Sequence, residues 1–447
     1  MTGRGDNPRI GWLPAGPRDS ICDVAGVTVG HATLAQGPLQ TGVTVVRPHG
    51  GDLFRDKVPA AAAILNGFGK SVGLVQVAEL GVLETPIALT NTFSVAAVAQ
   101  AQIRAALQAN PEIGRAWPTV NPLVFECNDG YLNDIQAMAV DGTHYAQALA
   151  AAGTECLEGA VGAGRGMSCF AFKGGIGTAS RQARDAAGPG YTVGALVLAN
   201  FGRRPALTVA GRPFGQWLEN ADASAAALER RDGAAVALRA QPQQTQTQTQ
   251  TETQTGTETQ TGTETQTGTE TQAQTRTETR APAAPAGAGL PDDGMPRWPM
   301  HEPPEGPTAV FAPVQRGADD IEKGSIILLL ATDAPLDARQ LRRLALRAGA
   351  GLARTGSVFG HGSGDIALAF STNYTVPHLP ERPMPAVAML HDARMDPLFE
   401  AAAEATEQAI VHALWQAETV TGRDGHVRQS IRTAVPQWRQ WLQTGAP

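Results

Sequence analysis

The sequence has few charged residues, few aromatic residues and no long apolar run. Charged side chains make up 17% of the 447 residues and the formal net charge is only −7, which argues against nucleic acid or an anionic membrane as the main partner. No segment approaches the roughly 18 consecutive apolar residues of a membrane-spanning helix. Aromatic residues make up 5%, so alanine and glycine supply much of the interior. We therefore expect a protein that binds neither nucleic acid nor a membrane.

Cysteines and histidines are also few, and they show none of the spacings of metal sites. The cysteines are scattered, without CxxC spacing, and no pair of the nine histidines has HxxxH or HExxH spacing. The first twenty residues lack the apolar stretch of a signal peptide. Scattered cysteines in a long chain are typical of reduced thiols. We expect a cytoplasmic protein with no metal site and no cofactor.

The clearest break in the sequence runs from Gln241 to about Arg280. It repeats Thr, Gln and Glu with almost no apolar residue, and a Pro-, Ala- and Gly-rich stretch follows to about Gly306. Such a composition cannot offset the entropy lost on ordering. We therefore predict a disordered insert at 241–306 inside a single catalytic domain that spans 1–447.

On both sides of this insert, short β-branched runs alternate with alanine-rich helical patterns. Strands are predicted at 23–34, 41–48, 122–126, 193–202, 326–332 and 364–372, the first two as a hairpin. Helices are predicted to begin after Ser94 as N-cap, near Asp337, and at Asp396-Pro397 with Asp396 as N-cap. This alternation indicates the α/β or α+β class, with helices that cover sheets.

Three polar groupings lie at the ends of predicted strands. Gly324-Ser325 precedes an apolar run, although such a pair is by itself ordinary loop sequence. Glu126 ends a strand just before a turn that contains Tyr131. Ser363 and Asp365 stand two residues apart at the start of a strand, which puts both side chains on one face.

Two further patterns admit more than one interpretation. The glycine-rich segment 159–181 lacks the strand–helix context of a dinucleotide fingerprint, and it fits either a loop that presents backbone N–H groups to a small ligand or plain turns. His361, in "GHGSGD", is most simply a structural or solvated loop residue. A Ser-His-Asp triad remains open, but the GxSxG turn that often carries such a serine is absent.

Taken together, eight motifs in order resemble the DmpA-like family of L-aminopeptidase/D-esterases and β-peptidyl aminopeptidases, with nylon-oligomer hydrolases as relatives. They are "RDSICDVAGVTVGHATL", "TGVTVV", "PIALTNTFSV", "ECNDGYLND", "GAVGAGRGMSCFAFKGGIGTASR", "GSIILLLATDAPLDARQLRRLALRAGAGLARTG", "GHGSGDIALAFST" and "DPLFEAAAEATEQAIVHAL". The resemblance runs from about Ile21 to His426, interrupted only by the insert. It implies an α+β fold, a four-layer αββα sandwich similar to the N-terminal-nucleophile hydrolases.

The resemblance also implies that the chain cleaves itself between Gly324 and Ser325. The products would be an α chain, 1–324, and a β chain, 325–447, with Ser325 as the nucleophile. Glycine before the bond can adopt strained conformations that open its carbonyl to attack. The freed α-amine has an ordinary pKa of about 7.7–8.0, so a useful fraction is neutral and can act as a base.

Further roles follow from the resemblance residue by residue. Ser363 and Asp365 match the serine and acid that orient the nucleophile, although some relatives carry the longer Glu at the acid position. Asn200 matches an asparagine that donates to the oxyanion, and Tyr131 matches a tyrosine that contacts the oxyanion or the substrate. Glu126 matches a carboxylate that pairs with the ammonium of the substrate.

The expected activity is cofactor-free hydrolysis of the N-terminal residue of a short peptide, amide or ester, through an acyl-enzyme on Ser325. The resemblance further implies a homo-oligomer, a tetramer of αβ units. Alternatives are an endo-acting hydrolase of ω-amino-acid (nylon-type) oligomers, an acyltransferase of the same fold, and an inactive ligand-binding member. The first two kinds of relative use threonine where this chain has Ser325, which favours the peptidase.

Overall fold

The structure is a computed structural model that describes residues 7–184, 190–224 and 323–445. These residues belong to one compact unit of the chain, formed by 1–232 together with 315–447. The insert predicted at 241–306 lies outside the described residues, so its disorder stays a prediction.

The larger of the two main sheets has seven strands, in the order β13-β3-β12-β11-β10-β9, with β4 paired to β3. Their bounds are β3 (Asp56–Gly67), β4 (Val82–Leu83), β9 (Gly175–Ala183), β10 (Tyr191–Asn200), β11 (Lys323–Thr332), β12 (Gly362–Ser371) and β13 (Val376–Pro377). β11 pairs antiparallel with β10 and parallel with β12. The strand that contains Gly324 and Ser325 therefore lies inside the sheet.

The smaller main sheet has the order β1-β2-β5-β6, with β1 (Thr28–Gln36), β2 (Leu39–Arg47), β5 (Ile87–Asn91) and β6 (Leu123–Cys127). β1 and β2 form the predicted hairpin, and β5 and β6 are parallel. Among the described residues, the helices are α1 (Leu74–Leu80), α2 (Val95–Ala109), α3 (Gly142–Ala150), α5 (Ala338–Arg354), α6 (Asp396–Trp415), α7 (Ile431–Ala434) and α8 (Trp438–Thr444), and residues 214–224 are also helical. Two short hairpins, β7 (Ser168–Cys169) with β8 (Phe172–Lys173) and β14 (Val420–Thr421) with β15 (Val427–Arg428), complete the described strands.

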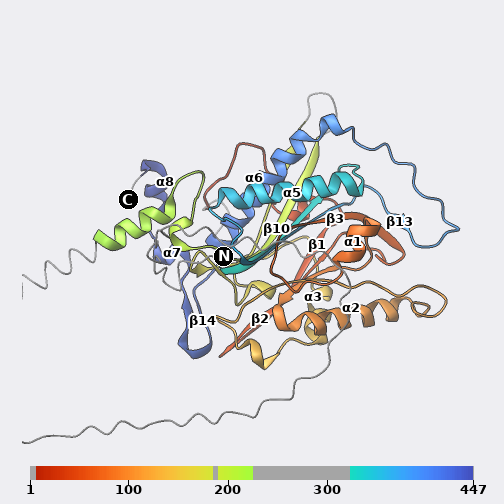
Figure 1. The fold of residues 1–447 in the computed structure, drawn as a ribbon, viewed down its shortest axis with the longest axis horizontal. Coiled ribbons are helices and arrows are strands. Elements are labelled where there is room, and N and C mark those ends of the chain that lie inside the picture. Colours follow the sequence, from red (N-terminus) through yellow and green to blue (C-terminus); the bar gives the residue numbers. More distant parts are fainter. Residues whose placement is uncertain (1–6, 185–189, 225–322, 446–447) are drawn as a thin grey trace, which may run out of the picture. The chain divides into compact units, whose positions relative to one another are not determined.

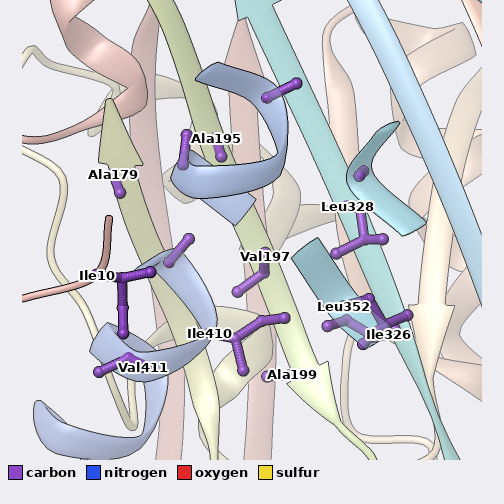
Figure 2. Close-up of a cluster of buried hydrophobic side chains, with 14 of the residues drawn as sticks. Ile10, Ala179, Ala195, Val197, Ala199, Ile326, Leu328, Leu352, Ile410 and Val411 are labelled. Carbon is purple, nitrogen blue, oxygen red and sulfur yellow. The ribbon is translucent and has the colours of Figure 1, made fainter. Parts of the chain in front are cut away.

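Side chains of β11 alternate between two hydrophobic cores. Ile326 and Leu328 belong to a cluster with Leu352 of α5 and Ile410 of α6 (Figure 2). Ile327, one position along, belongs to a second cluster that joins the two main sheets. A third cluster joins the small sheet to α2 and α3, which lie on the other side from α5 and α6 (Figure 1). This helix–sheet–sheet–helix order confirms the predicted α+β four-layer αββα sandwich.

The predicted helix starts lie within one residue of the observed ones, but the capping interactions are not always those predicted. α5 begins with a capping box, in which the side chains of Asp337 and Gln340 each bind the backbone N–H of the other residue. At α2 Ser94 is the N-cap residue, as predicted, but its side chain makes no capping hydrogen bond, and the Asn91 side chain caps the preceding turn. At α6 Asp396 is the first helical residue rather than the N-cap, since a proline is tolerated anywhere in a first turn whose N–H groups lack helical partners.

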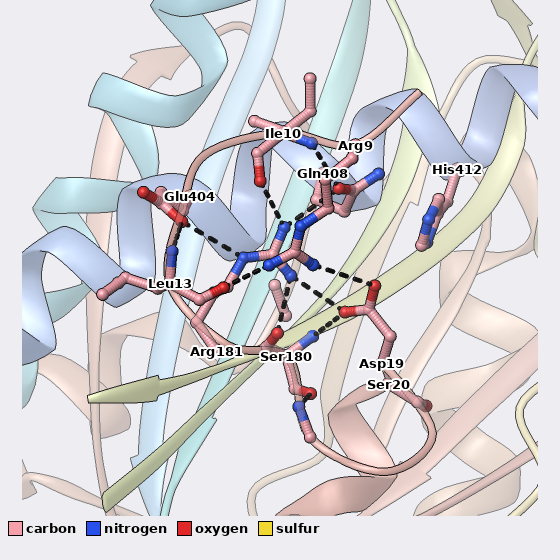
Figure 3. Close-up of polar contacts among 12 residues, drawn as sticks. Arg9, Ile10, Leu13, Asp19, Ser20, Ser180, Arg181, Glu404, Gln408 and His412 are labelled. Atoms are coloured by element: carbon pink, nitrogen blue, oxygen red, sulfur yellow. Dashed lines mark hydrogen bonds and ion pairs between the residues drawn. The ribbon is translucent and has the colours of Figure 1, made fainter. Parts of the chain in front are cut away.

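A buried polar cluster fastens the N-terminal segment, 7–20, to β9 and α6 (Figure 3). At its centre is Arg181, which is fully buried. Its guanidinium contacts Asp19 at 3.0 Å, Glu404 at 3.3 Å and the Gln408 side chain at 3.0 Å. Glu404 in turn accepts hydrogen bonds from two backbone N–H groups of the segment. The segment is therefore bonded to an ion pair that joins β9 to α6.

Candidate active site

Ser325 lies near the start of β11, where three strands of the large sheet meet. Its partners in the ladders are Asn200, at the end of β10, and Gly364, near the start of β12. The Ser325 hydroxyl oxygen accepts a hydrogen bond from the Gly364 N–H at 3.1 Å. The residue is 7% exposed, so the hydroxyl is nearly enclosed in the intact chain. Strand pairing thus brings two predicted motifs, around residues 200 and 364, to the predicted nucleophile.

Gly324, the residue before the predicted cleavage site, has a φ of +113°, in a region that L side chains rarely adopt. A Cβ atom on Gly324 would lie 2.0 Å from the carbonyl oxygen of Asn200. Glycine is therefore the residue that both the backbone conformation and the space at this position require.

Ser363 and Asp365 form a buried pair on either side of Gly364. The Ser363 hydroxyl donates to the Asp365 carboxylate at 2.5 Å, and neither residue is exposed. Asn66 of β3 donates to the carbonyl of Gly360, just before β12, at 2.7 Å and to that of Ser363 at 2.6 Å. These bonds fix the backbone that carries the pair. Ser363 and Asp365 are consequently held next to the Gly364 N–H, which binds the Ser325 hydroxyl.

Asn200 is oriented by two hydrogen bonds of its side-chain amide. Its Oδ1 accepts from the backbone N–H of Ser168 at 2.8 Å, and its Nδ2 donates to the carbonyl of Asn128 at 2.9 Å. An amide nitrogen carries two hydrogens, so Nδ2 has a second N–H besides the one given to Asn128. Asn200 can therefore keep its position and still donate to another oxygen.

Glu126, at the end region of β6, is 3% exposed. One carboxylate oxygen accepts a hydrogen bond from the Lys70 N–H at 2.8 Å, and the other accepts one from the Thr92 hydroxyl. Both of these donors are uncharged. They hydrogen-bond to the carboxylate but do not neutralise its charge. A cationic group of the substrate could therefore form an ion pair with it.

Tyr131 is half-exposed, with 39% of its surface accessible. Its ring stacks on His426 at 4.7 Å with an interplanar angle of 15°, and the guanidinium carbon of Arg428 lies 3.6 Å from the ring centroid. Tyr131 follows shortly after Asn128, whose carbonyl binds Asn200. The ring therefore stands on the same turn that orients Asn200.

Cys127 is a contact of Ser325 that was not predicted, because the scattered spacing of the cysteines indicates only reduced thiols. Its thiol donates to the backbone carbonyl of Ser325 at 3.3 Å. Burial raises the pKa of Cys127 well above its ordinary value, and the charges of Glu126, Asp365 and Asp129 raise it further. The bond from Cys127 to Ser325, and the pairing of Ser325 with Gly364, bring the segments around 126 and 365 together beside the predicted nucleophile.

Lys173 is a second unexpected residue, in the glycine-rich segment 159–181. It is fully buried, and its ammonium donates to the carbonyls of Gly164, Met167 and Gly174 at 2.7–2.9 Å. The segment comprises turns, the β7–β8 hairpin and most of strand β9, and the N–H of Ser168 in β7 donates to Asn200. Of the two interpretations left open, these contacts agree with packed turns.

Other candidate features do not involve these residues. His361 is exposed and lies 6.3 Å from the Phe68 ring, whereas the hydrogen bond to Ser325 Oγ comes from a backbone N–H. Two surface grooves of about 640 and 520 Å³ lie along α2 and α3, and no predicted site residue lines either. Within the described ranges, no group of three or more His, Cys, Asp or Glu residues could hold a metal. No helix in those ranges is long and apolar enough to cross a bilayer.

Comparison with known proteins places this arrangement in a family. The sequence model of peptidase family S58 matches residues 19–428. The beta-peptidyl aminopeptidase BapA of Sphingosinicella microcystinivorans is 35% identical over 427 residues, which cover 93% of this chain and 86% of that protein. The solved structure of a Burkholderia sp. beta-aminopeptidase is 34% identical, with a TM-score of 0.70 and 98% of both chains covered.

A third relative is an L-aminopeptidase D-Ala-esterase/amidase from Ochrobactrum anthropi, described as a prototype for the serine aminopeptidases and a variant of the N-terminal-nucleophile hydrolase fold. Its structure is 28% identical to this chain, with a TM-score of 0.68 and 97% of both chains covered. These matches extend over both sides of the predicted insert, and they confirm the fold and the resemblance inferred from the motifs. The chain therefore belongs to peptidase family S58 and is a hydrolase of the serine aminopeptidase type.

Proposed function

We propose that the protein is a self-processing aminopeptidase whose nucleophile is Ser325, freed by cleavage of the Gly324–Ser325 bond. The observation that carries this proposal is the position of Ser325, whose hydroxyl is bonded to Gly364 N–H between Asn200 and the Ser363–Asp365 pair. The conformation of Gly324 supports the cleavage site, since a side chain there would collide with β10.

Processing begins when the Ser325 hydroxyl attacks the carbonyl of Gly324. The acyl group moves from the amide nitrogen to the serine oxygen, and water then hydrolyses the resulting ester. The products are the α chain, 1–324, and the β chain, 325–447, which begins with a free α-amine. Because the ordinary pKa of an α-amine is about 7.7–8.0, part of it is neutral near pH 7 and can take the proton of the Ser325 hydroxyl. We assign the orientation of this amine to Ser363 and Asp365, which flank Gly364.

In turnover, Ser325 attacks the carbonyl of the substrate, and negative charge develops on the carbonyl oxygen. The second N–H of Asn200 and the hydroxyl of Tyr131 are the donors that we assign to this oxyanion. Loss of one such donor typically raises the barrier by about 2.7–4 kcal/mol. The α-ammonium returns its proton to the leaving group, and water hydrolyses the acyl-enzyme.

The substrate is a short peptide, amide or ester with a free N-terminal amine. Glu126 supports this requirement, because the donors that solvate its buried carboxylate are uncharged. The names of the relatives make β-amino-acid amides and peptides the first substrates to test. The endo-acting and ligand-binding alternatives are not favoured, because the relatives reported above are named as aminopeptidases.

The cellular compartment and the assembly of the protein are also part of this proposal. The four cysteines are buried and are not joined by disulfides, which supports a reducing compartment such as the cytoplasm. The tetramer of αβ units rests on the family resemblance alone.

The test is the N-terminal sequence of the smaller fragment. Purified wild-type protein should separate in a denaturing gel into chains of 324 and 123 residues, and the smaller should begin at Ser325. Ser325→Ala should remain a single chain and should not hydrolyse substrate. A small fragment that begins at any other residue would disprove the assignment of the nucleophile.

A further inference from the structure

Arg428, at the end of β15, contacts the ring of Tyr131 and a serine, Ser168, whose backbone N–H binds Asn200. We propose that Arg428 is a positioning residue, which fixes the Tyr131 ring and the Asn200 amide in the places that the transition state requires. This inference rests on the proposed function, and it concerns a residue in the last hairpin before α7.

The first branch runs from Arg428 to Tyr131. The guanidinium carbon lies 3.6 Å from the centroid of the tyrosine ring, close enough for a strong cation–π contact. His426, two residues before Arg428, stacks on the same ring, and its Nδ1 lies 2.8 Å from the Tyr131 carbonyl oxygen. Tyr131 is half-exposed, so these two residues of the hairpin restrict a side chain that solvent would otherwise leave mobile.

The second branch runs from Arg428 to Asn200 through Ser168. Arg428 Nε donates to the Ser168 hydroxyl at 3.2 Å, and the Ser168 N–H donates to Asn200 Oδ1 at 2.8 Å. Asn200 is the ladder partner of Ser325. Arg428 therefore contacts Tyr131 directly and is linked through Ser168 to Asn200, which lies beside the nucleophile.

The hairpin that carries Arg428 is itself bonded to the turn that carries Tyr131. The backbone N–H of Arg423 donates to the carbonyl of Leu132 at 2.8 Å, and its Nε donates to the carbonyl of Gly130 at 2.7 Å. These bonds fix the spacing between the two backbones. The position of Arg428 is consequently fixed by the backbone of its hairpin as well as by the contacts of its side chain.

Arginine suits this double role because its guanidinium is planar. Its face can lie on an aromatic ring while its edge donates in the plane to the serine hydroxyl. A lysine ammonium is a compact charge on a flexible stem and cannot do both in one position. Arg428→Lys should therefore behave like a loss of the side chain and not like a conservative change.

The effect should appear in kcat rather than in KM. Misplaced oxyanion donors weaken interactions that form mainly in the transition state, so substrate binding changes little. We expect Arg428→Gln and Arg428→Lys to lower kcat by about 10- to 100-fold while KM stays within about threefold. Ser168→Ala removes only the hydroxyl that receives Arg428 Nε and keeps the backbone N–H, so it should lower kcat by a smaller factor of about 3 to 10.

The experiment measures steady-state kinetics and melting temperature of fully processed protein with a free-amine β-alanyl or alanyl p-nitroanilide. Tyr131→Phe and the double variant with Arg428→Gln complete a cycle, in which the combined loss should be smaller than the product of the single losses because Arg428 acts partly through Tyr131. Arg347→Gln is the matched control. Its guanidinium also covers an aromatic ring, that of Phe399 at 4.0 Å, but it lies on α5, away from the site.

A merely structural Arg428 would lower the melting temperature and leave kcat at the wild-type value, and that result would overturn the inference. Unchanged kcat in Ser168→Ala, whose small change should not prevent folding, would overturn the branch to Asn200. Independent losses of Tyr131 and Arg428 would overturn the branch to the tyrosine. Failure of the proposed function would give a different result from failure of this inference. Ser325→Ala would then remain active, whatever the kinetics of the Arg428 variants.

Discussion

At the scale of single residues, Glu126 holds a carboxylate in an almost fully buried position with a backbone N–H and a hydroxyl as its donors. A buried charge is unfavourable unless it is paired, so an arriving ammonium gains from completing the pair. A hydrogen bond between charged groups contributes about 1.5–3 kcal/mol. This is the physical basis for expecting selectivity for substrates with a free amine.

Glu126→Gln should separate turnover from processing. The amide can keep both local bonds, since its oxygen can accept from Lys70 N–H and its NH₂ can donate to the Thr92 hydroxyl. We expect kcat/KM for free-amine substrates to fall by about 10- to 100-fold, while cleavage at Ser325, which needs no free amine, proceeds normally. Kinetics with free and N-acetylated versions of one substrate, and a gel of the purified variant, measure both effects. Equal hydrolysis of the two substrates by the wild type would contradict the role of Glu126.

Asp129, in the same turn, gives a dependence of stability on pH. Burial raises the pKa of this fully buried carboxyl to about 6, against about 3.9 in an unfolded chain. Between these two pKa values the native state binds more protons than the unfolded state, so the free energy of unfolding falls as pH rises. Above pH 6 the loss is complete and is about 3 kcal/mol, whereas below about pH 4 it is absent.

Asp129→Asn should therefore be more stable than the wild type at pH 7–8 and equally stable near pH 4. The amide keeps an oxygen for the hydrogen bond from Asn133, so the change removes mainly the buried charge. Denaturant unfolding of both proteins across this pH range measures the difference. A difference that is constant with pH would mean that Asp129 is not the group that titrates.

At the scale of elements, sequence patterns predicted some of the long elements but not all of them. The apolar runs of β10, β11 and β12 and the capped start of α5 are visible in the sequence and are present in the structure. The long strands β3 and β9 were not predicted. Neither were β4, β7, β8, β13, β14 and β15, which have two residues each, too few to show a period.

The same limit applies to the candidate site. Its motifs could be found by resemblance, because each is a continuous stretch of sequence. The supporting contacts could not, because their partners are remote: Arg428 and Ser168 are 260 positions apart, and Cys127 and Ser325 are 198 apart. Only the fold brings such pairs together.

The attachment of segment 7–20 to β9 and α6 depends on one buried charge. Arg181→Met should lower the free energy of unfolding by about 3–5 kcal/mol, because it removes the cation that pairs with the buried carboxylate of Glu404. Arg382→Ala is the control, since its ion pair with Asp56 is largely exposed and is worth about 0–1 kcal/mol. Denaturant unfolding measures both. Similar small losses in the two variants would show that the cluster around Arg181 is not important for stability.

At the scale of the whole molecule, the two sides of the sequence insert form one compact unit, and β11 is inserted between strands that precede and follow it. Deletion of 241–280 shortens a connection without touching the described residues, and loop-closure entropy then changes by less than about 1 kcal/mol. We expect near wild-type processing, kcat and melting temperature, measured on the deletion variant beside the full chain. A well-folded deletion variant with much lower activity would assign a function to the insert.

The place of β11 also determines the order of events in the life of this enzyme. The conformation of Gly324 and the N–H of Gly364 come together only in a finished sheet, so the chain has to fold before it can be cut. After the cut, the new terminus lies inside the sheet, hydrogen-bonded to β10 on one side and β12 on the other. Once unfolded, the two pieces would have to find each other in solution, without the high effective concentration that covalent linkage provides. The working lifetime of the mature enzyme would then be governed by how rarely it opens, and not by its capacity to refold.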